Sequence, residues 1–201
     1  MLRIGVTGRM ASGKSTVARR FEALGATRVD GDALGWETLR DPAVTRAIAA
    51  AFGPAVIGSS GAVDRARLGA VVFRDRDAMS RLNAIVQPPL LARVRAALAA
   101  AEGDGVLALD AALLSTWGLE PELDGVVEVT APEEVRVGRL WKVRGGSEAE
   151  ARERIAGQDL PPLARTVAFW RIENDADVAA LTRKADRVWE EILKLEKPKS
   201  A

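Results

Sequence analysis

The sequence contains neither cysteine nor histidine. The lack of cysteine excludes disulfide bonds, thiolate metal sites and a cysteine nucleophile. The lack of histidine leaves acid–base chemistry to carboxylates and leaves metal binding to oxygen ligands, which favour a hard cation such as Mg²⁺. Aromatic residues make up only 4% of the chain, so we expect no base-stacking surface for nucleic acid.

Charge of one sign is also lacking. Lysine and arginine together number 29 and aspartate and glutamate 28, so no net field favours nucleic acid or an anionic membrane. Arginines interrupt the long apolar runs, and the motif described next begins at residue 8, too early to follow a signal peptide. With 201 residues we expect one cytoplasmic domain, a monomer or a weak homo-oligomer, with no nucleic-acid or membrane partner.

The strongest motif is GRMASGKST, which fits G-x-x-x-x-G-K-[S/T]. In that pattern backbone N–H groups cradle phosphates, the lysine reaches the outer phosphates and the hydroxyl holds Mg²⁺. The required strand and helix are predicted at 2–6 and 16–24, and the helix N-terminus adds to the anion site. These flanks argue against a glycine-rich turn that matches by chance. The predicted nucleotide-binding residues are Gly8, Arg9, Met10, Ala11, Ser12, Gly13, Lys14, Ser15 and Thr16.

Elsewhere predicted strands alternate with helices. Further strands are expected near 26–29, 105–110, 125–130 and 167–172. The stretch 42–101 is predicted to be mostly helical, with Ala47, Ile48, Ala51 and Phe52 on one face. Pro132 is predicted to open a later helix, and Ser147 with Glu150 to cap the next one. The last helix is expected to be amphipathic and to carry Val178, Leu181, Val188, Trp189, Ile192 and Leu193.

This alternation predicts an α/β fold with a mostly parallel sheet between helices, as in the three-layer αβα sandwich of P-loop NTPases. Ligands in such sheets bind at the carboxyl ends of strands, where acids are found here. Asp32 is placed to act as the base for an attacking hydroxyl, or else Asp30 or Asp32 caps a helix beginning near Ala33. Asp110 lies at the end of an apolar strand, the usual position of a carboxylate that helps to hold Mg²⁺. The alternative is that it caps a loop.

A series of basic residues precedes the pair Gly145 and Gly146: Arg136, Arg139, Lys142 and Arg144. A mobile segment of this kind would close over a triphosphate, neutralise its charge and exclude water. A solvated helix face is the alternative. The residues alone thus predict a small P-loop phosphotransferase.

The order of motifs resembles the dephospho-CoA kinase family. The loop, Leu24-Gly25 and Asp30-Gly31-Asp32 match the family's start, in which the loop is followed by "LG" and "DAD". Later matches keep their order: Phe52-Gly53, Leu82-Asn83, Asp110 with Leu113-Leu114, Arg139-Leu140, Gln158 and Ile172-Glu173-Asn174. The resemblance covers nearly the whole chain. It implies transfer of the ATP γ-phosphate to the ribose 3′-hydroxyl of dephospho-CoA, with Mg²⁺.

The resemblance also implies roles for individual residues. Asp32 is then the base, and Lys14 and Arg139 are the other catalytic residues. Arg139 also binds the nucleotide, and Asn174 lies at its adenine side. Acceptor binding falls to Thr7, Asp32, Arg65, Gln87 and Asp110, and the metal to Ser15 and Asp110. Trp36 is a candidate wall of the acceptor cleft. We expect a P-loop core over 1–40, 104–132 and 165–201, a helical acceptor region over 41–103 and a lid over 133–164.

The chain departs from the family pattern at several places. Arg9 replaces a glycine, Gln87 a histidine and Ala112 a proline, and Thr116, Val143 and Phe169 also differ. A divergent kinase for another nucleoside-like acceptor, or an inactive paralogue, therefore stays open. A GTPase switch is disfavoured, because its Asn-Lys-x-Asp signature is met only by Arg183-Lys184-Ala185-Asp186, which lacks the asparagine.

Overall fold

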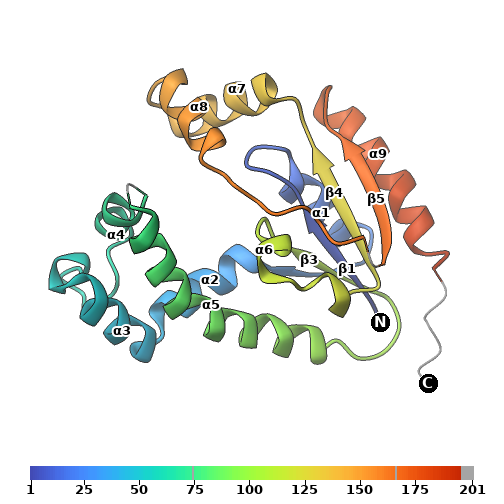
Figure 1. Cartoon of the computed structure of the whole chain (residues 1–201). Helices are drawn as coiled ribbons and strands as arrows, with labels where there is room; N and C mark the ends of the chain where they lie inside the picture. The colour runs from blue at the N-terminus through green and yellow to red at the C-terminus, as the bar shows by residue number, and fades with distance from the viewer. Residues whose placement is uncertain (74, 166, 196–201) are drawn as a thin grey trace. The chain divides into compact units, whose positions relative to one another are not determined.

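The computed structural model describes residues 1–73, 75–165 and 167–195. A phosphate-loop segment, a helical insertion and a second α/β segment follow one another along the chain (Figure 1). The elements are β1 Leu2–Thr7, α1 Lys14–Ala23, β2 Thr27–Asp30, α2 Gly31–Arg40, α3 Pro42–Phe52, η1 Pro54–Val56, α4 Arg65–Val72, α5 Arg76–Ala99, β3 Val106–Asp110, α6 Leu114–Trp117, η2 Glu120–Glu122, β4 Gly125–Thr130, α7 Glu133–Arg144, α8 Glu148–Ala156, β5 Ala168–Glu173 and α9 Val178–Ile192.

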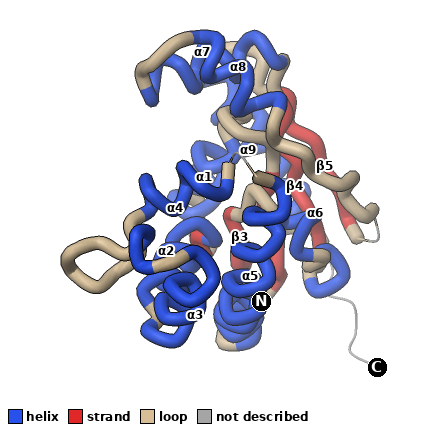
Figure 2. The backbone as a smooth tube through the Cα atoms, turned by 60° about the vertical axis from the view of Figure 1, so that its left-hand side comes forward, coloured by secondary structure: helices blue, strands red, loops and turns tan. Residues whose placement is uncertain are grey.

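The five strands form one sheet in the order β2-β3-β1-β4-β5, and each neighbouring pair is parallel. Figure 2 shows the strands in red among the helices. Because the strands are parallel, their carboxyl ends share one edge, where β1 passes into the loop before α1. In register, Val6 of β1 lies opposite Asp110 of β3, and Asp110 in turn lies opposite Asp30 of β2. The predicted parallel α/β sheet is confirmed.

Both faces of the sheet are covered. On one face α1 and α9 pack against the strands, with Ile4, Val6 and Phe21 fully buried in the same core as Trp189. On the other face a Cβ at Gly5 would lie 2.7 Å from Leu123 and 2.8 Å from Leu114, so only glycine admits these side chains. Side chains from both layers thus fix β1, which carries the phosphate loop.

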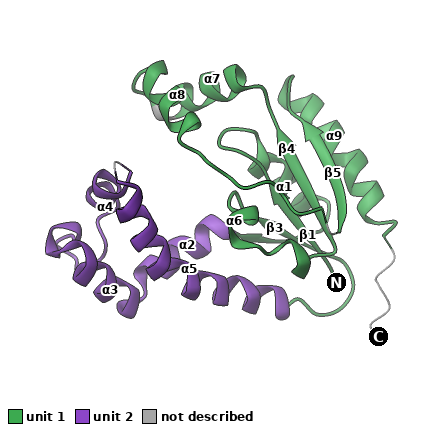
Figure 3. Cartoon of the chain, in the orientation of Figure 1, with its two compact units in different colours: residues 1–30, 101–201 green, residues 31–100 purple. Residues whose placement is uncertain are grey.

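The chain divides into two compact units, residues 1–30 with 101–201 and residues 31–100 (Figure 3). The first unit contains the sheet. The second unit contains α2 to α5 and has its own core, formed by Val44, Ile48, Val56, Leu68, Val72 and Ala78. Helix α2 is thus grouped with the helices that follow it.

Some details differ from the sequence predictions. On α3 the buried face is Val44, Ile48 and the partly buried Phe52, whereas Ala47 and Ala51 are exposed, because large side chains four residues apart define the apolar stripe. Val178, the first residue of α9, and Leu193, directly after its end, lie outside the core, with 68% and 57% of their surface exposed. Helix α5, by contrast, agrees with the predicted helical stretch 42–101 and continues through Pro88 and Pro89, where its packing against α2, α3 and α4 outweighs the lost backbone hydrogen bonds.

Candidate active site

The phosphate loop joins β1 to α1, and α1 begins at Lys14, as the motif predicts. Gly13 has φ of +101° and Ala11 has φ of +61°, so the loop contains two left-handed residues in three positions. A Cβ at Gly13 would overlap Nδ2 of Asn174. Glycine is therefore required at position 13 both by the backbone conformation and by the side chain packed against it.

Asn174 and Arg139 hold this loop from two other elements. Asn174, which follows β5 and is buried, donates from Nδ2 to the backbone oxygen of Ser12 at 2.7 Å. Arg139 of α7 donates from Nη1 to the backbone oxygens of Ala11 and Ser12 at 3.4 and 3.5 Å. Its Nη2 donates to Oδ1 of Asn174 at 3.0 Å. The structure thus brings both residues to the loop, where the family resemblance places them on the nucleotide.

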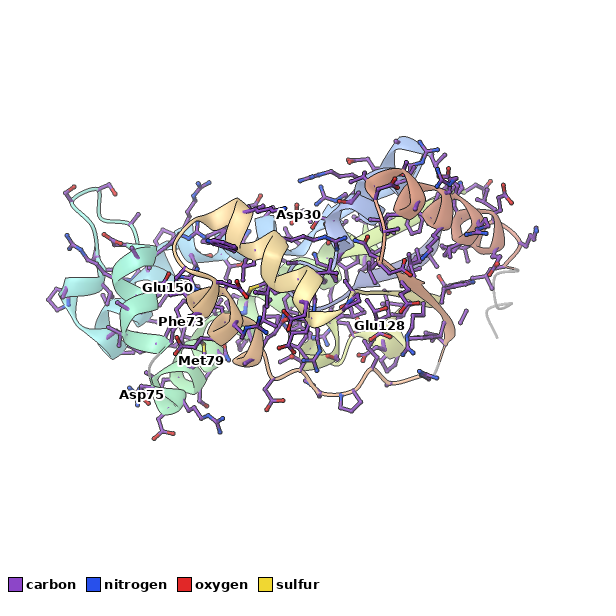
Figure 4. All side chains as sticks on the ribbon, turned by 90° about the horizontal axis from the view of Figure 1, so that it is seen from above. Asp30, Phe73, Asp75, Met79, Glu128 and Glu150 are labelled. Carbon is purple, nitrogen blue, oxygen red and sulfur yellow. The ribbon has the colours of Figure 1, made fainter. Side chains whose placement is uncertain are left out.

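The pair of helices α7 and α8 also contacts the loop. Met10 and Ala11 pack against a small core of Val137, Leu140, Ala151 and Ile155. The backbone N–H of Met10 donates to Oε1 of Gln158 at 2.7 Å, and the Arg9 side chain reaches the backbone oxygen of Gln158 at 3.5 Å. Helix α8 begins with the predicted capping box, in which Ser147 and Glu150 exchange hydrogen bonds. Figure 4 labels Glu150.

The basic series on α7 is not a uniform solvated face. Arg136 is buried, with 6% of its surface exposed, and donates from Nε to the backbone oxygen of Ala131 at 3.2 Å. Burial and the nearby charge of Arg9 lower the pKa of Arg136, and Glu133 offsets them only partly. Lys142 is exposed, and the Arg144 side chain lies outside the described residues. Arg136 and Arg139 therefore bind backbone oxygens within the fold, whereas Lys142 is exposed to solvent.

Four charged side chains meet at the carboxyl ends of β2 and β3. Lys14 donates to Oδ1 of Asp110, whose side chain is only 1% exposed. Arg28 donates from Nη2 to Oδ2 of Asp110 and to Oδ2 of Asp30, each at 2.6 Å. Burial lowers the pKa of Arg28, but the hydrogen bonds and charges of Asp110 and Asp30 more than offset this effect. The pKa is raised overall, so the guanidinium is charged.

Both oxygens of Asp110 are therefore paired with cations, while Ser15 follows Lys14 in the first turn of α1. A hydroxyl and one carboxylate fit a magnesium ion that takes its other ligands from phosphates and water. Within the described ranges, no group of three or more acidic residues forms a cation site made by the protein alone. The donors present thus suit Mg²⁺ that arrives with a nucleotide.

The remaining predicted residues lie elsewhere. Thr7 ends β1 and is buried, and Gly8 follows it against the backbone of Val129. Asp32, Arg65 and Gln87 belong to the unit of residues 31–100. Helix α2 begins at Gly31, before Ala33, so Asp32 lies inside its first turn and is not its N-cap residue. Gln87 is half-buried within α5.

The unit of residues 31–100 contains a groove of its own, about 570 Å³ in volume. Trp36 and Arg65 line it, and the guanidinium of Arg65 lies over the indole ring of Trp36. The other lining residues are Ala33, Glu37, Leu39, Arg40, Ala62 and Val63. A cation, an aromatic face and apolar walls suit a ligand with both charged and apolar parts.

Sequence reasoning missed Arg28 and the contact of Gln158 with the loop. Arg28 sits on the second strand, where a single arginine gives no motif, and its partner Asp110 is 82 residues away. Gln158 appeared only as a family match, and nothing in its neighbourhood predicts a hydrogen bond to Met10. The Arg183 to Asp186 string lies within α9, where Lys184 binds Asp175 and Asp186 binds Arg20, which leaves no guanine site there.

No helix in the described part of the chain is both long enough and apolar enough to cross a membrane. The parallel sheet, the phosphate loop with its lysine at the helix N-terminus, and the arginine held over that loop together define a P-loop kinase.

The comparisons identify the family. A family model described as Dephospho-CoA kinase matches residues 2–180. The Dephospho-CoA kinase of Streptomyces avermitilis is 37% identical over 195 residues, which cover 96% of this chain and 95% of that protein. That of Mycobacterium tuberculosis is 40% identical over 192 residues, covering 94% of this chain and 47% of that protein. The chain therefore belongs to the dephospho-CoA kinase family.

A solved structure is similar to this chain over nearly its whole length. The crystal structure of TT1252 from Thermus thermophilus superposes with a TM-score of 0.74 and 32% identity, covering 95% of this chain and 97% of that one. The agreement extends over both compact units, since few residues of either chain fall outside it.

Proposed function

We propose that the protein transfers the γ-phosphate of ATP to the ribose 3′-hydroxyl of dephospho-CoA, giving CoA and ADP, the last step of CoA biosynthesis. The observation that carries the proposal is the family match over residues 2–180, which includes the phosphate loop, Asp32, Arg139 and Asn174. We expect this activity in the cytoplasm, as for a small-molecule enzyme without nucleic-acid or membrane partners.

The nucleotide is bound by the loop and by α1. The loop's backbone N–H groups and the positive end of α1 attract the phosphates, and Lys14 leaves Asp110 to reach the outer ones. Arg139 already contacts the loop at Ala11 and Ser12, so a modest movement of its guanidinium brings its charge to the transferred group. Asn174 keeps the loop in shape by binding the oxygen of Ser12.

The acceptor hydroxyl attacks the γ-phosphorus as the bond to the β,γ-bridging oxygen breaks, and ADP leaves with that electron pair. Asp32 accepts the hydroxyl proton. Because such catalysis is mostly positioning and charge neutralisation, an ordinary carboxylate suffices as the base. Mg²⁺, held by Ser15 and Asp110, would neutralise the phosphates when bound. The groove at Trp36 and Arg65 is the part of the helical unit that we assign to the acceptor.

The test is ADP release from Mg·ATP with dephospho-CoA and with a panel of nucleosides and nucleotides. We expect turnover with dephospho-CoA that falls by about 10²- to 10⁴-fold in Asp32→Asn, the usual effect of removing a general base. Asp77→Asn is the matched control, because Asp77 is an exposed carboxylate in the first turn of α5 in the same unit and does not line the groove, and it should keep the wild-type rate. Turnover with another acceptor would redirect the assignment, and ATP binding with no turnover on any acceptor would mark an inactive relative.

A further inference from the structure

Arg28 lies between two carboxylates at the edge of the sheet where the phosphate loop begins. Strands β2 and β3 pair so that Asp30 is opposite Asp110, and one nitrogen of Arg28 binds both, each at 2.6 Å. Figure 4 labels Asp30, at the end of β2. The Arg28 side chain is 13% exposed, so most of its charge is shielded from water and balanced by these two acids.

Asp110 is also the partner of Lys14, the lysine of the phosphate loop. Its carboxylate is almost wholly buried, and its two oxygens are divided between Lys14 and Arg28. A triphosphate needs the same ammonium group. Asp110 and the nucleotide therefore compete for Lys14.

We propose that Arg28 is a positioning residue, which keeps Asp110 paired and in place and so frees Lys14 for the nucleotide. A buried carboxylate that loses its cation is strongly destabilised, so Asp110 would retain Lys14 if Arg28 were absent. With Arg28 in place the carboxylate keeps one partner when Lys14 moves. Asp30 anchors Arg28 from the other side, so the guanidinium does not follow the phosphates. The inference rests on the proposed use of ATP at this loop.

The experiment is calorimetric titration of ATP in EDTA, without acceptor, so that neither Mg²⁺ nor dephospho-CoA contributes. Arg28→Met should weaken ATP binding at least about tenfold, which corresponds to about 1.4 kcal/mol. Arg28→Lys should stay near the wild-type affinity, because a single nitrogen makes both contacts and an ammonium group can replace it. If Arg28→Met does not fold, Arg28→Gln, which keeps a hydrogen-bond donor without the charge, should show the same loss.

The same change made in an Asp110→Asn background isolates the mechanism. Once Asp110 is neutral it no longer retains Lys14, so Arg28→Met should then leave ATP affinity unchanged. The control is Arg20→Met, which breaks a more exposed arginine–aspartate ion pair with Asp186 on the same unit and should not alter ATP affinity. Circular dichroism establishes that each variant is folded.

Two results would overturn the proposal: a folded Arg28→Met protein with wild-type affinity, or an equal loss in both backgrounds. The second would mean that Arg28 acts on the nucleotide directly or on the fold. Neither result depends on the acceptor, so the inference can fail while phosphorylation of dephospho-CoA stands. If wild-type protein binds ATP neither in EDTA nor with Mg²⁺ present, the proposed function fails first.

Discussion

Arg139 and Asn174 are joined side chain to side chain, with Nη2 of the arginine donating to Oδ1 of the asparagine at 3.0 Å. Through this contact α7 is tied to the residue after β5, and both side chains bind the backbone of Ser12. Arg139, which we assign to phosphoryl transfer, thus donates its hydrogen bonds to backbone carbonyl oxygens of the phosphate loop. A triphosphate offers it stronger, charged acceptors within a short reach.

Replacement of Arg139 tests that assignment. We expect Arg139→Met to lower kcat by about 10²- to 10³-fold, because the charge that develops on the transferred group loses its cation. Arg139→Lys should recover part of the loss. Steady-state ADP release measures both. Arg152→Met removes an exposed arginine from α8, paired with Glu134 and Glu148, and should leave kcat unchanged. Normal kcat in Arg139→Met would contradict the role.

Gly13→Ala should abolish measurable ATP binding. The alanine would be held at φ of +101°, and its Cβ would overlap Nδ2 of Asn174. Gly25→Ala is a matched control, since Gly25 has φ of +106° but no atom lies within 4 Å of the added Cβ. That control should lose about 1–2 kcal/mol of stability from backbone strain and bind ATP normally. Calorimetric titration compares the two, and a Gly13→Ala protein that binds ATP normally would refute the close-packing argument.

The groove of the helical unit provides a test of acceptor binding. Trp36→Leu or Arg65→Leu should raise the KM for dephospho-CoA about tenfold and leave the KM for ATP unchanged, because each removes one half of a stacked cation and ring. Arg81 lies over Phe52 in the same unit but outside the groove, so Arg81→Leu is the control. An increase in the KM for ATP, or equal effects in all three variants, would argue against an acceptor site here.

The ion pair of Arg20 and Asp186 predicts a pH-dependent difference in stability. Hydrogen bonding from Arg20 lowers the pKa of Asp186 from its ordinary value of 3.8. A carboxylate of lowered pKa stabilises the fold above its unfolded pKa, and this contribution is lost as pH falls through the lowered value. We therefore expect Asp186→Asn to lower Tm slightly at pH 7, with the difference beginning to shrink below about pH 3.8 and disappearing as pH falls through the lowered pKa of Asp186.

Thermal melts of wild type and Asp186→Asn from pH 7 to pH 3 measure this difference. The effect is small because both side chains are about one third exposed and water screens the pair. Asp104→Asn is the control, since Asp104 is exposed and makes no ion pair with the residues that the structure describes. A Tm difference for Asp186→Asn that stays constant down to pH 3 would show that the pair contributes through packing and not through charge.

Local patterns predicted most of the elements, because the determining residues are close in sequence. The phosphate loop has its glycines and lysine in one run, and the Ser147 and Glu150 capping box needs only four consecutive positions. On α3 the predicted inward face was partly wrong, because it included Ala47 and Ala51, which are exposed. The larger side chains of Val44 and Ile48 are buried and define that face. Helix α5 agrees with the predicted helical stretch, although Pro88 and Pro89 each remove a backbone hydrogen bond from it.

The candidate site was predicted less completely, because its contacts span long distances along the chain. The approach of Asn174 to Ser12 crosses 162 positions, and that of Arg28 to Asp110 crosses 82. Sequence spacing carries no signal at such ranges, and only the register of β2 against β3 brings Arg28 into place. Family resemblance supplied Asn174 and Arg139, whereas Arg28 lies in no family motif and required the structure.

The strand order has a consequence for synthesis of the chain. β1 pairs with β3 and β4, and β2 pairs with β3. The partners of both early strands therefore lie after residues 31–100 in the sequence. As the chain leaves the ribosome, the first thirty residues have no sheet to join until residue 110 has been made. The helical unit, whose contacts are local and whose core is its own, should therefore fold first. During that interval the apolar segment of β1 is a natural target for chaperones.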